Sequence, residues 1–297
     1  MKKSNFSSLI ILFFLLVITR QAVSQCSDAG VCVISHKQND SLGTGLSSIT
    51  LGLGLGSSGS ESDINGALND LFFSSAKAEA DLYLSKKSCL IIGIPYTIID
   101  GPLGQNNGIG DLTLLYNHKF TIKKKHGLTF SVGGKISVAD VNTKDSLPQR
   151  YMPGLGTNDL IVGATYSYQY YSISAGYQKP FGRSANTVTR LKRGDDIFFH
   201  AGYNQKFNKV LIKSEILTII RIQESSVLVS GTTDTYTDIQ GSNEPQVNLL
   251  ASVGYIVNKN IVLSVEAAFP FLQRNYNYDG LKRSFTAAAS VSYLFKL

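Results

Sequence analysis

The chain has 297 residues with 28 lysines and arginines against 21 acidic residues, and its charged fraction of 16% lies below the ~25% usual for soluble domains. Its 27 glycines, 15 phenylalanines and 15 tyrosines, with three cysteines and no tryptophan, exclude a coiled coil, a disulfide scaffold and a long disordered tail. A bundle of membrane-spanning helices would need several runs of ~20 apolar residues. One comparable run exists, at the N-terminus.

That N-terminal run has the layout of a secretory signal peptide. Lys2 and Lys3 precede an apolar stretch at 9–18, and an Ala-Val-Ser cleavage site ends at Ser24. The alternative is a membrane anchor, for which the stretch is short. We therefore expect residues 1–24 to be removed. This segment holds three basic residues and no acidic one, so its removal lowers the net charge from +7 to +4, too mild to imply a nucleic-acid partner.

The segment 25–45 that follows is polar and has no helical periodicity. Cys26 and Cys32 lie six residues apart within it, and the oxidising compartment of an exported protein favours a disulfide between them. Metal binding is the rival interpretation, but no cluster of histidine and cysteine accompanies the pair. The sequence therefore predicts neither a metal site nor a cofactor.

Residues 46–297 contain twelve segments with the alternation of apolar and polar residues that is typical of β-strands. Most are ten to thirteen residues long, which suits a tilted strand crossing a membrane (~9–11 residues) better than a soluble strand (~5–6). The predicted strands are 46–57, 76–85, 89–99, 110–121, 128–139, 158–169, 172–181, 195–207, 210–222, 246–257, 261–271 and 284–297.

The connections between these strands alternate between short and long along the whole domain. Short ones such as 86–88 and 208–209 separate long ones such as 140–157 and 223–245. An up-and-down barrel has tight turns at one rim and longer loops at the other. Because lipid offers no water to backbone groups, a membrane-spanning sheet must also close on itself. The sequence therefore predicts an all-β protein, a twelve-stranded antiparallel up-and-down transmembrane β-barrel.

The two faces of the strands differ in chemistry. On the last strand Val291, Tyr293 and Phe295 share one face, while Ser290 and Ser292 share the other. The apolar face recurs on strand after strand and is expected to meet lipid, with tyrosines and phenylalanines near the strand ends as interfacial girdles. The opposite faces gather ionisable groups of both signs. The candidates for lining a pore are Glu79, Asp81, Lys135, His200, Lys213, Glu215, Arg221 and Glu266. Alternatively, these charges pair and fill the lumen as a structural network.

Two of the predicted strands are irregular. The strand at 89–99 alternates poorly and contains Pro95, which removes a ladder donor, so a bulge is expected there. The strand at 210–222 is apolar on both faces at one end, at Leu217, Ile219 and Ile220. Its lumenal side is expected to pack under a loop or to bind an apolar ligand.

Some twelve-stranded outer-membrane barrels are lipid hydrolases, so a catalytic function is an alternative for this chain. These enzymes need a serine and a histidine within hydrogen-bond reach, two residues apart on the exterior face of a strand. By alternation His118 faces lipid and His200 faces inward, and neither has a serine two positions away. The chain is therefore predicted not to be an enzyme.

Two glycine-rich segments resemble a known family. Residues 107–116, Asn-Gly-Ile-Gly-Asp-Leu-Thr-Leu-Leu-Tyr, resemble a G-x-G-D segment of the MetA-pathway phenol-degradation family, and 154–160 resembles its later G-x-G-x-x-D segment. The segment 94–96, Ile-Pro-Tyr, is also similar to the family. The resemblance implies a FadL-like transporter in the outer membrane of a Gram-negative bacterium, passing small apolar or aromatic compounds. It also implies that 25–45 folds into the lumen as a plug, the alternative being a segment that hangs in the periplasm.

These patterns predict a passive outer-membrane channel with a narrow or gated pore. The alternative is a closed barrel without a pore, whose loop at 223–245 binds a ligand or partner, and a lipid hydrolase is more remote. The C-terminal residues 293–297 resemble the signal that the barrel-assembly machinery reads. The expected partners are therefore that machinery, outer-membrane lipid and an unidentified small solute, with no nucleic acid.

Overall fold

The structure is a computed structural model that describes residues 46–62, 68–123, 125–144, 146–276, 278–282 and 284–296. The predicted signal peptide at 1–24 and the segment 25–45, with Cys26 and Cys32, lie outside the described residues. Among those that are described, no helix is long and apolar enough to cross a membrane.

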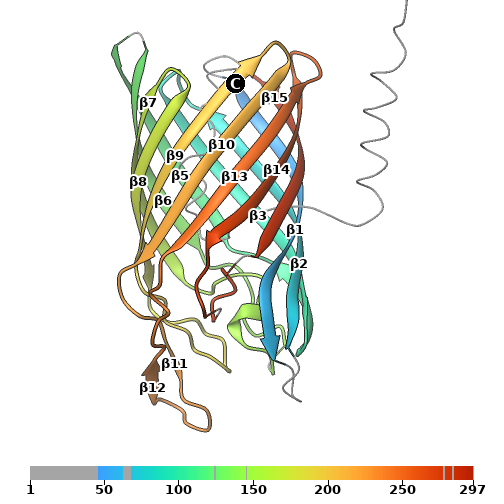
Figure 1. Ribbon diagram of the computed structural model, residues 1–297, viewed down its shortest axis with the longest axis vertical. Coiled ribbons are helices and arrows are strands. Elements are labelled where there is room, and N and C mark those ends of the chain that lie inside the picture. The colour runs from blue at the N-terminus through green and yellow to red at the C-terminus, as the bar shows by residue number, and fades with distance from the viewer. Residues whose placement is uncertain are drawn as a thin grey trace, which may run out of the picture.

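The described strands close into one antiparallel barrel (Figure 1). Its strands are β1 (Ser47–Ser62), β2 (Leu68–Tyr83), β3 (Ser88–Gly101), β4 (Gly104–Ile109), β5 (Leu112–Lys123), β6 (His126–Ile136), β7 (Asn158–Tyr168), β8 (Tyr171–Phe181), β9 (Asp196–Phe207), β10 (Val210–Arg221), β13 (Gln246–Ile256), β14 (Ile261–Leu272) and β15 (Phe285–Phe295). Because β4 and β5 are consecutive parts of one barrel strand beside β3, the barrel has twelve. Closure comes from β1 and β15, which place Ser47 opposite Phe295. This confirms the predicted fold.

The short and long connections lie at opposite ends of the barrel (Figure 1). The C-terminus lies at the end with the tight turns, which we call the turn end. The other end, called the loop end, carries the 3₁₀ helix η3 (Gln149–Tyr151) and the small hairpin of β11 (Ser226–Leu228) and β12 (Tyr236–Asp238). The β6–β7, β8–β9, β10–β13 and β14–β15 connections are long and lie at the loop end, as predicted, whereas residues 102–103 alone connect β3 to β4.

Two connections predicted as loops, 58–75 and 100–109, consist largely of strand. Strand β2 begins at Leu68, and β4 pairs with β3 down to Gly101 opposite Gly104. The inner faces of these extensions carry Leu71, Phe73 and Ile99, which form one buried cluster with Tyr151 of η3. The β6–β7 connection, which is distant in sequence, thus covers these extensions. The local sequence therefore gives no sign that their inner faces are buried.

The bulge expected in the strand at 89–99 lies on its neighbour instead. Gly93 is opposite Thr113 and Tyr96 is opposite Ile109, so residues 110–112 face only two residues of β3. Alternation within β3 is regular, with Ile91 and Ile99 buried while Ile94 and Ile98 are exposed. The strand looked irregular because its inner face is also apolar.

The outer surface is apolar, and the inward-facing side chains are largely buried. Along β15, Val291 and Tyr293 are 48% and 51% exposed, whereas Ser292 and Leu294 are 4% and 2% exposed. Exposed isoleucine, leucine, valine and aromatic side chains recur on the outward face of the other strands. Exposure of so large an apolar surface to water is unfavourable, so this exterior is suited to contact with lipid.

Candidate functional site: the loop-filled mouth of the barrel

The predicted pore-lining residues all lie on the lumenal faces of their strands. Glu79, Asp81, Lys135, His200, Glu215 and Arg221 are buried, and Lys213 and Glu266 are half-buried. The structure therefore places the eight inside the barrel, but it does not test whether any of them lines an open pore, which stays a prediction.

Several of these charges pair within the lumen. Lys77 Nζ lies 2.6 Å from Glu79 Oε2 on β2. On β10, Lys213 Nζ lies 2.9 Å from Glu215 Oε2. Such pairs agree with the alternative in which charges neutralise one another and fill the lumen.

A larger buried network lies at the loop end of the lumen. Its members are three arginines and three aspartates, each with a side chain at most 5% exposed. They come from β7, β9 and β10 and from the β8–β9 and β14–β15 connections: Arg193, Arg221, Arg274, Asp159, Asp196 and Asp279. Equal numbers of opposite charges allow the group to be buried without a net charge.

Arg221 ties the β14–β15 connection to the barrel wall. Its Nε donates to Asp196 Oδ1 at 3.0 Å, and its Nη2 donates to Asp279 Oδ2 at 2.9 Å. Arg274, from the same connection as Asp279, donates from Nη2 to Asp196 Oδ1 at 3.4 Å. The connection is therefore fastened at two points to the rim of the lumen.

Arg193 does the same for the β8–β9 connection. Its Nη1 donates to Asp159 Oδ2 at 3.0 Å and its Nη2 to Asp196 Oδ2 at 3.1 Å. Gln178 Nε2 also donates to Asp159 Oδ2. Two loops far apart in sequence are thus held over the same end of the lumen.

The charge state of Asp279 follows from this packing. Burial opposes ionisation of its carboxyl group, but the guanidinium groups of Arg221, Arg274 and Arg193 outweigh burial and hold the pKa of Asp279 below its ordinary value. The carboxylate therefore stays charged at neutral pH, and the network keeps its balance of charge.

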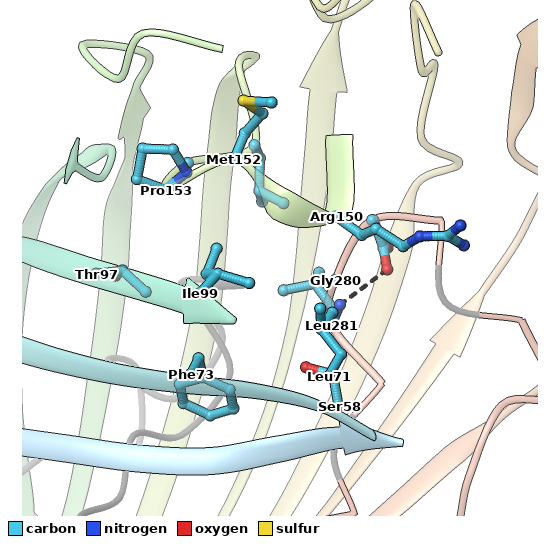
Figure 2. Close-up of a pocket in the computed structure, with 13 residues that line it drawn as sticks. Ser58, Leu71, Phe73, Thr97, Ile99, Arg150, Met152, Pro153, Gly280 and Leu281 are labelled. Carbon is cyan, nitrogen blue, oxygen red and sulfur yellow. Dashed lines mark hydrogen bonds between the residues drawn. The ribbon is translucent and has the colours of Figure 1, made fainter. Parts of the chain in front are cut away.

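A small cavity lies between the loops and the inner wall (Figure 2). Phe73 and Ile99 of the wall face Met152 of the β6–β7 connection, and Leu281 of the β14–β15 connection closes another side. The volume is about 20 Å³, room for a water molecule rather than an organic solute. The lining is mixed, because Asp279 of the charged network and Arg150 line the cavity together with these apolar side chains.

The loops also reach deeper into the lumen. Leu155 and Leu281 belong to a buried cluster that includes Phe198 of β9 and Leu217 and Ile219 of β10. Of the two expectations for the apolar end of β10, packing under a loop is the one that the structure bears out. Burial of this apolar surface holds the loops inward.

The two glycine-rich segments singled out in the sequence meet at this site. Asp111 Oδ2 accepts a hydrogen bond from the Leu155 N–H at 2.7 Å and lies 3.9 Å from Lys135 Nζ. A Cβ atom at Gly154 would lie 2.5 Å from Asp111 Oδ1. A Cβ atom at Gly110 would lie 2.7 Å from the carbonyl oxygen of Pro153. The glycines therefore permit close contact between the bulge and the β6–β7 connection.

We expect Gly110→Ala to loosen this contact. A methyl group 2.7 Å from a backbone oxygen forces a shift, with a cost of about 1–3 kcal/mol. The measurement is the rate at which a protease cleaves the β6–β7 connection in the detergent-solubilised barrel, which should rise. Gly52→Ala is the control, because its Cβ would meet nothing closer than 3.5 Å. Equal cleavage of both variants would contradict the close-contact argument.

The exterior holds a serine–histidine pair that the sequence test overlooked. Ser88 of β3 is directly opposite His118 of β5, and Ser88 Oγ lies 3.0 Å from His118 Nδ1. Alternation along a single strand does not reveal this pair, because Ser88 and His118 lie on two neighbouring strands. Tyr116 Oη donates to Ser88 Oγ and lies 3.4 Å from His118 Nδ1, and His118 also contacts the ring of Phe120. Among the described contacts of His118 no carboxylate or amide orients the ring, unlike in a catalytic triad.

The part of the chain that the structure describes contains no group of three or more histidine, cysteine or acidic residues arranged to hold a metal ion. His200 lies inside the barrel, where its ring meets the edge of the Phe198 ring with centroids 6.0 Å apart.

No family model matches the chain, and no curated protein matches its sequence. Among solved structures, the chain is similar to an outer-membrane channel from Pseudomonas putida F1, with 13% identity over 85% of this chain and 96% of that one and a TM-score of 0.64. It also matches the NanC porin (8% identity, 84% and 100% covered, TM-score 0.48) and outer-membrane phospholipase A from Escherichia coli (9%, 82% and 95%, 0.45). The likeness to the first of these shows that this chain has the β-barrel fold of an outer-membrane channel.

Proposed function

We propose that this protein is a gated channel of the outer membrane that passes small molecules passively. The observation that carries the proposal is the folding of the long connections into one end of an otherwise lipid-suited barrel, fastened by the arginine–aspartate network. Loops held by a few ion pairs and a small apolar cluster form an element that can open.

Small apolar or aromatic compounds are the proposed substrates. The inner wall under the loops carries Leu71, Phe73 and Ile99, so opening of the loops would expose an apolar surface to an entering solute. The two glycine-rich segments add support, since they resemble those of the MetA-pathway phenol-degradation family. Membership of that family, with its FadL-like transporters, is part of the proposal.

The proposed setting includes three partners. The apolar exterior would contact outer-membrane lipid, the C-terminal strand would engage the barrel-assembly machinery, and the solute would enter at the loop end. We also propose that the chain is not an enzyme, because the Ser88–His118 pair has no orienting acid among its contacts.

A closed barrel that binds a partner through its loops remains the second candidate. The β11–β12 hairpin extends beyond the other loops at the loop end (Figure 1). Its Tyr236 lies under the Arg183 guanidinium, 3.7 Å from the ring centroid, which steadies the hairpin as a contact surface.

Solute uptake by liposomes that contain the refolded mature chain tests the proposal. We expect phenol to enter faster than into protein-free liposomes, and faster than a sugar of similar size. Trimming residues 25–45 in a second preparation tests the proposed plug. Uptake no faster than in empty liposomes, for both preparations and for the loop variants in the Discussion, would favour the closed barrel.

A further inference from the structure

The exposed charges at the turn end of the barrel are predominantly positive. Among the described residues, six exposed lysines lie in the short turns or just after the last strand: Lys86, Lys87, Lys125, Lys209, Lys259 and Lys296. The described turns at 84–87, 169–170, 208–209 and 257–260 contain no aspartate or glutamate. The turn end is therefore a basic rim.

The loop end does not share this bias. Its connections mix lysines such as Lys144 and Lys192 with acidic residues such as Asp140, Asp234 and Asp238. The basic rim is thus a local feature of one end rather than a consequence of the net charge.

A chain of hydrogen bonds lies on the outer face beside this rim. Ser88 follows Lys87 directly, and its Oγ accepts from Tyr116 Oη at 3.0 Å and lies 3.0 Å from His118 Nδ1. All three side chains project from the outward faces of β3 and β5. They place hydroxyl and imidazole groups next to two lysines.

A second group of the same kind lies two strands away. His126 follows Lys125, and its Nδ1 lies 2.6 Å from Tyr166 Oη of β7. The rings of Phe120 and Phe130, with centroids 5.8 Å apart, lie on the intervening strands β5 and β6. The outer face of β3, β5, β6 and β7 therefore carries two groups of lysine, histidine and hydroxyl side chains with this phenylalanine pair between them, and we call the two groups together the band.

The position of this band suits the headgroup layer of a membrane. Tyrosine and histidine have an apolar body and a polar tip, so at the end of a spanning strand they sit where lipid headgroups begin. The short turns of outer-membrane barrels face the periplasm. Lysines and hydroxyl donors at that level match an anionic phosphate diester.

We propose that the band formed by Lys86, Lys87, Ser88, His118, Lys125 and His126 binds the phosphate groups of anionic phospholipids in the periplasmic leaflet. The inference rests on the membrane location that forms part of the proposed function, and not on the passage of any solute. Its failure is therefore distinguishable from that of the channel, because lipid binding is measured without conductance.

Competition between phosphatidylglycerol and phosphatidylcholine tests this site. The mature chain in detergent is mixed with both lipids in equal amounts, and native mass spectrometry counts those retained. We expect phosphatidylglycerol to be retained about fivefold more, and Lys86→Gln/Lys87→Gln to bring the ratio close to one. The matched control is Lys144→Gln/Lys192→Gln, which removes two exposed lysines from the loop end and should leave the ratio unchanged.

Three outcomes would overturn the proposal. One is the absence of any preference in the unaltered chain. Another is an equal loss in both double variants, which would indicate a response to total charge. Folding is checked by the gel shift on heating, and Ser88→Ala/Lys125→Gln supplies a second test on different residues. Retention that no rim variant alters would also reject the lipid site and favour an acidic periplasmic protein as the partner of the lysines.

Discussion

Asp279→Asn is expected to open the mouth of the barrel. Asp279 accepts from Arg221 and lies within 4.0 Å of both Arg193 and Arg274, and its side chain is 5% exposed. Asparagine removes one negative charge and leaves three buried arginines with two aspartates. Loss of one partner from a buried ion pair costs about 3–5 kcal/mol, because the other charges stay buried without compensation. We expect the β14–β15 connection to leave the lumen, because this movement relieves the unbalanced buried charge.

The measurement is single-channel conductance in planar bilayers. We expect larger and longer openings for Asp279→Asn than for the unaltered chain. Asp234→Asn is the matched control, because Asp234 lies in a connection at the same end but is 81% exposed and pairs with the exposed Arg190 at 3.8 Å. An exposed pair of this kind contributes about 0–1 kcal/mol, so this variant should behave as the unaltered chain does. Identical conductance for all three proteins would mean that the network is not the gate.

Tyr151→Ala is expected to release the β6–β7 connection from the mouth of the barrel. Tyr151 is fully buried among Leu71, Ile99 and Leu147, and its Oη accepts from the Leu103 N–H at 3.1 Å. Truncation of a buried aromatic residue to alanine costs about 3–5 kcal/mol in lost contacts and cavity formation. The η3 helix should therefore detach and the cavity beneath it should enlarge.

Uptake of phenol into liposomes should consequently accelerate for Tyr151→Ala. The temperature at which the barrel loses its compact gel mobility should change little, because pairing between the strands is untouched. Tyr276→Ala is the control, since Tyr276 lies in another connection at the same end and is 46% exposed. If Tyr151→Ala lowered the gel-shift temperature strongly and left uptake unchanged, Tyr151 would serve barrel stability rather than closure.

The two variants also separate the charged and apolar contributions to closure. Asp279 acts through the β8–β9 and β14–β15 connections, while Tyr151 acts through the β6–β7 connection. Closure by all three loops together predicts that either variant raises permeability. If only one of the two variants raised permeability, the connections that this variant releases would be the ones that open.

Local sequence determined the barrel itself. The alternation of residues such as Val291, Ser292 and Tyr293 shows both faces of a strand within a few positions, because successive side chains point to opposite sides. Turn lengths are equally local, so the sorting of short and long connections, and hence the twelve-stranded closed topology, could be read from the chain. The inward direction of the eight charged candidates followed from the same period of two.

Tertiary structure alone decided what fills the barrel. The hydrogen bond from Arg221 to Asp279 spans 58 positions in the sequence, and the one from Arg274 to Asp196 spans 78. No periodic pattern in the sequence predicts contacts at such separations. The Ser88–His118 pair depends on the register between β3 and β5, and the bulge at 110–112 sets where that register changes. Arg193, Arg274 and Asp279 were overlooked because they lie in loops, where side-chain direction has no period. Strand faces are a property of neighbours in sequence, whereas loop docking depends on which distant charges and apolar side chains meet once the barrel has closed.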